Sequence, residues 1–161
     1  MRFLERVPLG TPYPDVATRA PNEAIASRCT LVMDATGVGA PVLDLLRRAD
    51  LGCGIEPVIL TGGERESHAG GVWHVPKHDL VSGLQTMLEK REIEIPAKYG
   101  PALLLGKELA NMGTRVGERG RFRIGRLNEE HDDLVIACAL GCWRARWKAQ
   151  SMWGRRSLGL G

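Results

Sequence analysis

Four carboxylates and a histidine lie within six consecutive residues, Asn128 to Asp133, directly ahead of a long apolar run. A single acid at a helix start is explained by capping, because its oxygen accepts an amide of the first turn. Four carboxylates this close repel one another, so the surplus needs another role. Asp132 and Asp133 are therefore candidates either for capping a core helix or for binding a divalent cation, which prefers carboxylate oxygens.

A further acid, Asp34, follows the short β-rich run Cys29 to Met33 and precedes a glycine-rich turn and a helix that has Pro41 in its first turn. Ligands of open α/β sheets bind at the carboxyl ends of strands. This position favours Asp34 as a metal-binding carboxylate. A plain structural turn and a phosphate-binding loop are the alternatives, although no G-x-G-x-x-G or G-K-[ST] motif is present.

Positive charge is concentrated late in the sequence. Residues 1–113 carry 12 Lys and Arg against 14 Asp and Glu, whereas residues 114–161 carry 10 against 5. Basic potential beside an acid cluster is typical of proteins that handle a polyanion together with metal ions.

Three arginines and one lysine are candidates for contact with phosphate groups. Alternation over 114–126 predicts a β-hairpin with Arg119, Arg121 and Arg123 on one face. Such a row suits phosphates, which guanidinium groups bind bidentately; a solvated hairpin is the alternative. Lys77 begins another predicted helix, where a cation opposes the helix dipole. A phosphate contact would compensate there, and a solvated lysine is the alternative.

The 161 residues suffice for one domain with a substantial core. Residues 1–145 are interpreted as that domain and 146–161 as a basic, flexible tail. Hydrophobic periodicity and turn residues predict the elements. We expect strands at 1–7, 29–33, 56–60, 72–75 and 92–95, helices at 13–27, from Pro41, from Pro76, at 101–112 and after Asp133, and a surface loop at 64–71.

Two of these helices carry predictions about burial. The last one is apolar on every face over its first turns, which predicts burial all round. In the helix at 101–112 the residues expected to face inward are Leu103, Leu104, Leu105 and Leu109.

Cysteine usage and hydropathy narrow the class of protein. Cys29, Cys53, Cys138 and Cys142 form no C-x-x-C pair, which favours buried thiols without disulfides over a zinc site. No apolar run reaches the roughly 18 to 20 residues that a membrane span requires. The first residues also lack the apolar core of a secretory signal, so we expect a cytoplasmic protein without a membrane partner.

Three segments in this order and spacing, strand-DATGVG-helix, VPKHDLV and HDDLVIACAL, resemble the C-terminal nuclease domain of the large terminase subunit of tailed bacteriophages and prophages. The similarity covers about residues 3–145. It implies an RNase H-like α/β fold, with a mixed sheet flanked by helices, that cuts DNA during genome packaging. The implied cofactors are two divalent metal ions, Mg²⁺ or Mn²⁺.

Carried over by position, the resemblance implies Asp34 and Asp133, with Asp132 beside it, as metal-binding and catalytic acids. Lys77 matches the family's lysine, and the hairpin at 115–126 matches one implicated in DNA contact. The implied partners are double-stranded DNA and, in the intact protein, the terminase ATPase domain, the small subunit and the portal, inside the bacterial host cell.

The sequence departs from the family at its start. The family's first metal-binding Asp precedes the stretch that begins at Arg2, so we expect a prophage fragment that lacks the central strand, with exposed strand edges. The ATPase motor motif is also missing. The first hypothesis is a metal-dependent endonuclease domain, either active or inactive as a fragment. A non-catalytic DNA-binding remnant is the second, and a nucleotide-binding enzyme that uses DATGVG is the third.

Overall fold

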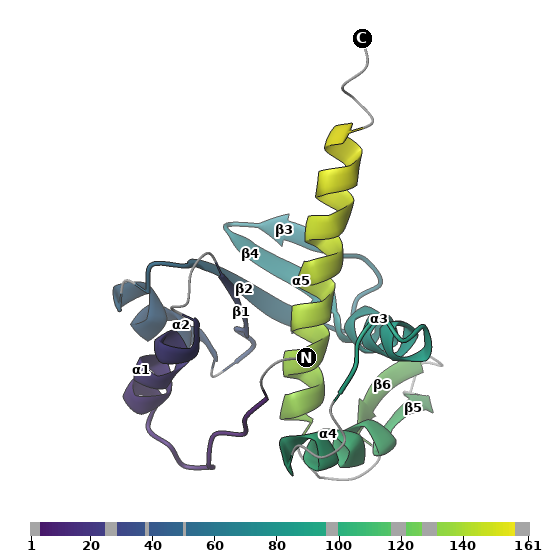
Figure 1. Cartoon of the computed structure of the whole chain (residues 1–161), viewed down its shortest axis with the longest axis horizontal. Helices are drawn as coiled ribbons and strands as arrows, with labels where there is room; N and C mark the ends of the chain where they lie inside the picture. Colours follow the sequence, from purple (N-terminus) through teal and green to yellow (C-terminus); the bar gives the residue numbers. More distant parts are fainter. Residues whose placement is uncertain are drawn as a thin grey trace.

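The computed structural model describes residues 4–24, 29–37, 39–49, 51–95, 100–116, 122–126 and 132–156. It contains a four-stranded sheet, helices on both sides of it and a separate two-stranded hairpin (Figure 1). Within this described part, no helix is both long and apolar enough to cross a bilayer.

The main sheet has the strand order β1-β2-β4-β3. Its strands are β1 (Thr30–Asp34), β2 (Gly54–Thr61), β3 (Ser67–Ala69) and β4 (Val72–Pro76). β1, β2 and β4 are parallel, and β3 is antiparallel to β4, so the sheet is mixed, as predicted. The carboxyl ends of the three parallel strands therefore share one edge. β1 pairs with β2 alone among the described residues, which leaves its outer edge without a strand there.

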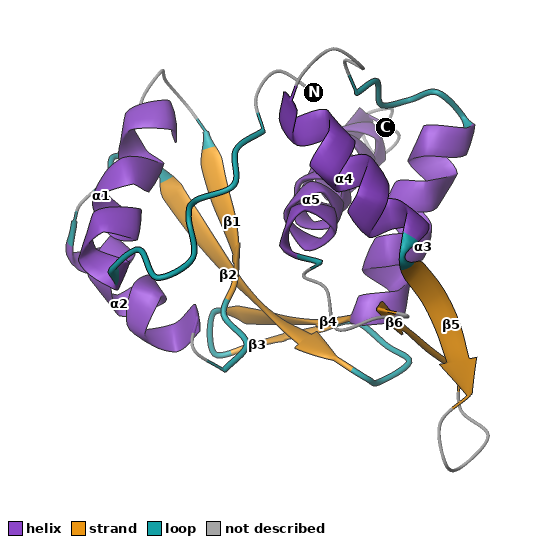
Figure 2. Cartoon of the chain, turned by 90° about the horizontal axis from the view of Figure 1, so that it is seen from below, coloured by secondary structure: helices purple, strands orange, loops and turns teal. Residues whose placement is uncertain are grey.

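Helices cover both faces of this sheet. α1 (Tyr13–Ala24) and α2 (Gly39–Arg48) lie on one side, and α3 (Lys77–Glu89), α4 (Gly100–Ala110) and α5 (Asp133–Arg156) lie on the other (Figure 2). The hairpin pairs β5 (Met112–Val116) with β6 (Phe122–Arg126) antiparallel, which confirms the predicted hairpin. α5 extends beyond the rest of the domain at its carboxyl end (Figure 1).

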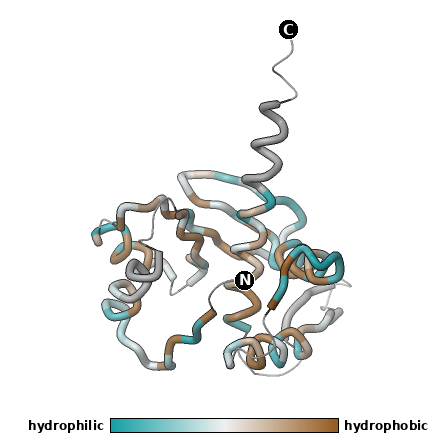
Figure 3. The backbone as a smooth tube through the Cα atoms, in the orientation of Figure 1, coloured by the Kyte–Doolittle hydropathy of each residue, from teal (hydrophilic) through white to brown (hydrophobic). Residues whose placement is uncertain are grey.

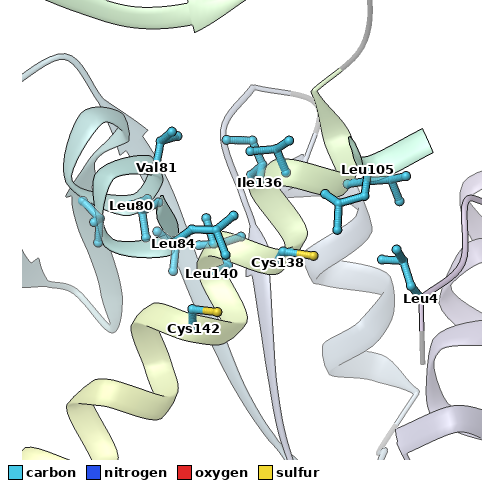
Figure 4. Packing of buried hydrophobic residues seen from close by; sticks show 14 residues of the cluster. Leu4, Leu80, Val81, Leu84, Leu105, Ile136, Cys138, Leu140 and Cys142 are labelled. Atoms are coloured by element: carbon cyan, nitrogen blue, oxygen red, sulfur yellow. The ribbon is translucent and has the colours of Figure 1, made fainter. Parts of the chain in front are cut away.

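The core lies between the sheet and α3, α4 and α5. Val58 of β2 and Val75 of β4 are completely buried. Figure 4 shows Leu84 of α3 packed against Leu140 of α5, with Leu105 of α4 beside the same helix. The first turns of α5 are the hydrophobic part of the helix in Figure 3. Burying such side chains contributes roughly 1.5 to 3 kcal/mol each, so this layer holds α5 in place.

Three predicted elements differ in the structure. Residues 4–8 form no strand, and neither do residues 92–95. The segment 64–71, predicted as loop, is exposed but contains the short strand β3. β-branched or apolar residues raise strand propensity, but a strand also needs a neighbour to pair with, which the sequence does not show.

Two burial predictions were also wrong in part. In α4 the predicted inward residues Leu103 and Leu104 are 66% and 42% exposed, whereas Glu108 is buried. α5 is not buried all round, because Ala137 and Gly141 are exposed. A row of leucines covers more than one face of a helix, so composition alone does not decide which face packs.

Gly39 begins α2 close under the end of β1. A Cβ atom built at this position would overlap the backbone carbonyl oxygen of Asp34. Backbone cannot move aside as a flexible side chain can. The close approach of α2 to β1 therefore requires glycine at this position.

We expect Gly39→Ala to lower the free energy of unfolding by roughly 1 to 3 kcal/mol, the usual cost of inserting a methyl group into a packed contact. Urea denaturation measures the change. Gly106→Ala is the matched control, since a Cβ there meets nothing within 4 Å. In a helix that replacement should be neutral or stabilising by up to about 1 kcal/mol. Equal effects of the two substitutions would contradict the assigned role of Gly39.

Candidate metal-binding acidic site

Two ion pairs, one near each end of the packed part of α5, fix the direction of this helix. Asp132 Oδ2 lies 2.6 Å from Lys77 Nζ, just after β4, and Arg144 Nε lies 2.5 Å from Glu56 Oε2 on β2. Twelve helical residues rise about 18 Å. By extension of the strand register Glu56 is level with Gly71, just before β4, and the six steps of chain from Gly71 along β4 to Lys77 span up to about 20 Å. α5 thus runs antiparallel to the parallel strands and begins at their carboxyl edge.

The amino end of α5 is capped by a side chain from another helix. Glu108 Oε2 accepts the backbone amides of Leu134 and Val135, at 2.9 and 3.1 Å. These are first-turn amides, which otherwise have no partner within a helix. At these two amides the cap is Glu108 rather than either of the adjacent aspartates, for which capping was one of two alternatives. Capping by Glu108 leaves the carboxylates of Asp132 and Asp133 available for other contacts.

Arg6 connects this cap to the exposed acid. Its guanidinium pairs with Glu108 Oε1 and places Nη1 3.4 Å from Asp133 Oδ2. Glu108 is only 8% exposed, whereas the Asp133 side chain is 64% exposed. A buried carboxylate needs a compensating cation and hydrogen bonds, and Glu108 has both. The contact with Asp133 is longer and more exposed, so it is the weaker of the two.

Lys77 and Asp132 form the best-defined polar contact between predicted site residues. At 2.6 Å the pair is a charge-assisted hydrogen bond, and the side chains are 31% and 15% exposed. The sequence assigned Lys77 to DNA and Asp132 to a metal, but in the structure they contact each other. Lys77 also links the start of α3 to the start of α5.

Asp34 ends β1 and is anchored in a turn. Its Oδ1 accepts the amide of Thr36 at 2.8 Å, and the Thr36 hydroxyl in turn accepts the amide of Leu60 on β2 at 2.8 Å. Gly37 has a positive φ of 58°, which suits glycine. Because one carboxylate oxygen is held by the backbone, the orientation of Asp34 is fixed before any ligand binds.

The acids of β1 and α5 share one edge of the sheet but do not form a compact cluster. Asp34 is level with Val58 on β2, which is level with Trp73 on β4. Asp34 therefore lies two strand spacings, about 10 Å, to the side of Trp73. Lys77 follows Trp73 by another four residues along the chain. Accordingly, the described residues contain no group of three His, Cys, Asp or Glu side chains placed to hold a metal ion.

Several predicted site residues lie wholly or partly beyond what the structure describes. Arg119 and Arg121 fall outside the described residues, as do Glu129, Glu130 and His131. Arg123 belongs to β6, and its side chain is not described. The proposed arginine row therefore stays a prediction, supported only by the confirmed hairpin.

Glu108 and Arg6 were not identified from the sequence. The available signal was the position of Glu108, three residues after buried Leu105 and six after buried Ala102, on one face of a helix. A charged residue on an apolar helical face is unusual and needs a partner. Arg6 lies in irregular chain, where no periodicity identifies contacts.

No family model matches the sequence, and no curated protein is significantly similar to it. Solved structures with a similar fold include the large terminase nuclease from thermophilic phage G20c, with a TM-score of 0.60, 20% identity and 81% of this chain covered. The same nuclease with bound cobalt gives a TM-score of 0.61, and with bound magnesium 0.60, each at 21% identity and covering 83% of this chain.

This chain spans about three fifths of the nucleases that it matches, with 61% or 62% of their length covered. The fold matches that of a terminase nuclease domain, RNase H-like, with a mixed four-stranded sheet flanked by helices. The fold class inferred from the sequence is thereby confirmed, and the resemblance to a terminase nuclease domain holds for the fold.

We expect Glu108→Ala to lower the free energy of unfolding by about 3 to 5 kcal/mol, because it removes a buried carboxylate that both caps α5 and pairs with Arg6. Chemical denaturation followed by circular dichroism measures this. Glu64→Ala, an exposed loop acid, is the control and should change stability by less than about 0.5 kcal/mol. A similarly small effect at Glu108 would show that the cap does not hold the helix.

Proposed function

We propose that this chain is a metal-dependent DNA endonuclease domain of the terminase type, which acts on double-stranded DNA in a bacterial host cell. The observation that carries the proposal is the direction of α5, which brings Asp132 and Asp133 to the sheet edge where β1 ends at Asp34. The likeness of the fold to a solved terminase nuclease supports it.

The carboxylates at this edge are of the type that divalent cations prefer, but the described residues hold too few of them for a complete site. Asp34 and Asp133 offer the carboxylate oxygens that Mg²⁺ and Mn²⁺ prefer. Asp34 is half-buried with one oxygen held by Thr36, and Asp133 is exposed, so both can reach a ligand. The described residues nevertheless contain no group of three metal-capable side chains. A complete two-ion site thus needs at least one acid beyond those described.

The residues present have distinct roles in the proposed site. Bound divalent ions supply an activated water and stabilise the leaving oxygen of a phosphodiester. Lys77 holds Asp132 in position and neutralises it, which lowers the repulsion between adjacent carboxylates. Glu108 fixes the first turn of α5, so that Asp133 is presented from a rigid element. The hairpin of β5 and β6, with Arg119, Arg121 and Arg123, is proposed to contact the DNA backbone.

A non-catalytic DNA-binding role is the second candidate. It is favoured by the ion pair of Asp132 with Lys77 and by the contact of Asp133 with Arg6, which give each acid a cationic neighbour without a metal, although Arg6 is shared with Glu108. Affinity for DNA that does not fall as the salt concentration rises would contradict this role, because phosphate contacts release counterions.

Nucleotide binding by the DATGVG turn has less support. The polar groups of this turn are used within the fold: the Asp34 carboxylate accepts the Thr36 amide, and the Thr36 hydroxyl accepts the Leu60 amide. Gly39 serves close packing of α2 against β1. Each of these contacts is accounted for by a structural turn.

We expect nicking of supercoiled plasmid in Mn²⁺ to fall by about 100-fold or more in Asp34→Ala and in Asp133→Ala, because each removes a carboxylate proposed to bind metal. Gel electrophoresis over time measures the rate. Asp44→Ala, an exposed acid on α2, is the control and should keep wild-type activity. Cleavage that persists unchanged in both site variants excludes the assignment.

We expect Arg6→Gln to raise the affinity for Mn²⁺ by about two- to five-fold, the effect of removing a cation that competes with the metal for the exposed Asp133. Titration calorimetry of the folded proteins measures it, and Arg65→Gln, in an exposed loop, is the control. Unchanged Mn²⁺ affinity in Arg6→Gln would indicate that Asp133 does not bind the metal. The same substitution also leaves Glu108 without its cation, so a lower thermal midpoint is expected beside it.

A further inference from the structure

Two cysteines meet at the amino ends of β1 and β2, the end of the sheet opposite the acids. Thr30 and Gly54 are register partners in these parallel strands, so the preceding residues, Cys29 and Cys53, face each other across the same pair. Their thiols are joined by a hydrogen bond. Neighbouring strands lie about 4.8 Å apart, which falls within the roughly 4.4 to 6.8 Å between Cα atoms that a disulfide spans.

The other two cysteines provide an internal contrast. Cys138 and Cys142 are buried in α5, as predicted, whereas Cys29 and Cys53 are only half-buried, so the prediction of burial is wrong for this pair. Burial, and then the neighbouring Cys142, raises the pKa of Cys138 to about 11, and burial also raises the pKa of Cys142. Burial and the hydrogen bond to Cys29 raise the pKa of Cys53. The direction of the pKa shift does not separate the two pairs, but their exposure does, so a reagent in solution reaches the half-buried pair more readily than the buried one.

We propose that Cys29 and Cys53 are a site of oxidative modification, at which a peroxide converts the two thiols into a disulfide that joins β1 to β2. One thiolate attacks the peroxide, the O–O bond breaks, and a sulfenic acid and hydroxide form. The second thiol attacks the sulfenic sulfur, the S–S bond forms as the S–O bond breaks, and the hydroxyl group leaves as water with the thiol proton. Two thiols and one peroxide give one disulfide and two waters.

The disulfide would close the loop of residues 29–53, which contains β1 and α2. Gly52, with a φ of 64°, and Gly54 flank Cys53, so the backbone there can adjust to the geometry of the bond. β1 has a strand neighbour on one side only among the described residues. A covalent link to β2 would therefore clamp the less supported strand, independently of any nuclease activity.

The test treats the full chain with stoichiometric hydrogen peroxide, blocks remaining thiols with N-ethylmaleimide and digests it with trypsin without reduction. Cys29 lies in the tryptic peptide 29–47, Cys53 in 49–65, and the buried pair together in 127–144. We expect peptides 29–47 and 49–65 to be linked, with the mass of two hydrogens lost, in protein that runs as a monomer on a non-reducing gel. Cys29→Ser and Cys53→Ser should abolish the link, and Cys142→Ala should keep it.

The thermal midpoint of the oxidised protein should rise by roughly 5 to 10 °C, as expected for closing a loop of this length in a domain of this size. The rise should be absent in Cys53→Ser. The proposal is overturned if both peptides are recovered singly alkylated, if the link occurs only in covalent dimers, or if peptide 127–144 is oxidised instead. Linked peptides without a rise in midpoint would contradict the clamping of β1.

Discussion

The buried carboxylate of Glu108 is the constraint on which the rest of the acidic edge depends. A carboxylate that is 8% exposed would be strongly destabilising alone, but here it accepts two amides of α5 and pairs with Arg6. The negative charge also interacts favourably with the positive amino end of the helix dipole of α5. One side chain thereby joins α4, α5 and the irregular chain near the amino terminus.

This arrangement explains why consecutive aspartates occur at a helix start without serving as its cap. Because Glu108 satisfies the first-turn amides, Asp132 is paired with Lys77 and Asp133 is directed to solvent beside Arg6. Each acid has a cation from a distant part of the sequence. These two aspartates and their cations thus connect α3, α5 and the segment of Arg6, whether or not a metal binds there.

The extent to which the sequence predicted this structure follows from the range of each interaction. Asp34 at the end of a strand and the helix after Asp133 follow from local patterns, and both are present. The contact of Asp132 with Lys77 is not local, since 55 residues separate them. The helical position of Glu108 could have indicated burial, but its partners could not be read from periodicity, because Arg6 lies 102 residues away in irregular chain.

The geometry also limits how a complete metal site could be formed. Asp34 is held to its backbone turn and lies about two strand spacings, roughly 10 Å, from the line of β4, while α5 is fixed by its cap and its ion pairs. Neither side can move far without losing these contacts. In the proposed metal site, a further acid would have to approach Asp34 from a direction that the described residues leave open. The outer edge of β1 is such a direction, since backbone groups there have no strand partner within the described chain and would pair with an added strand.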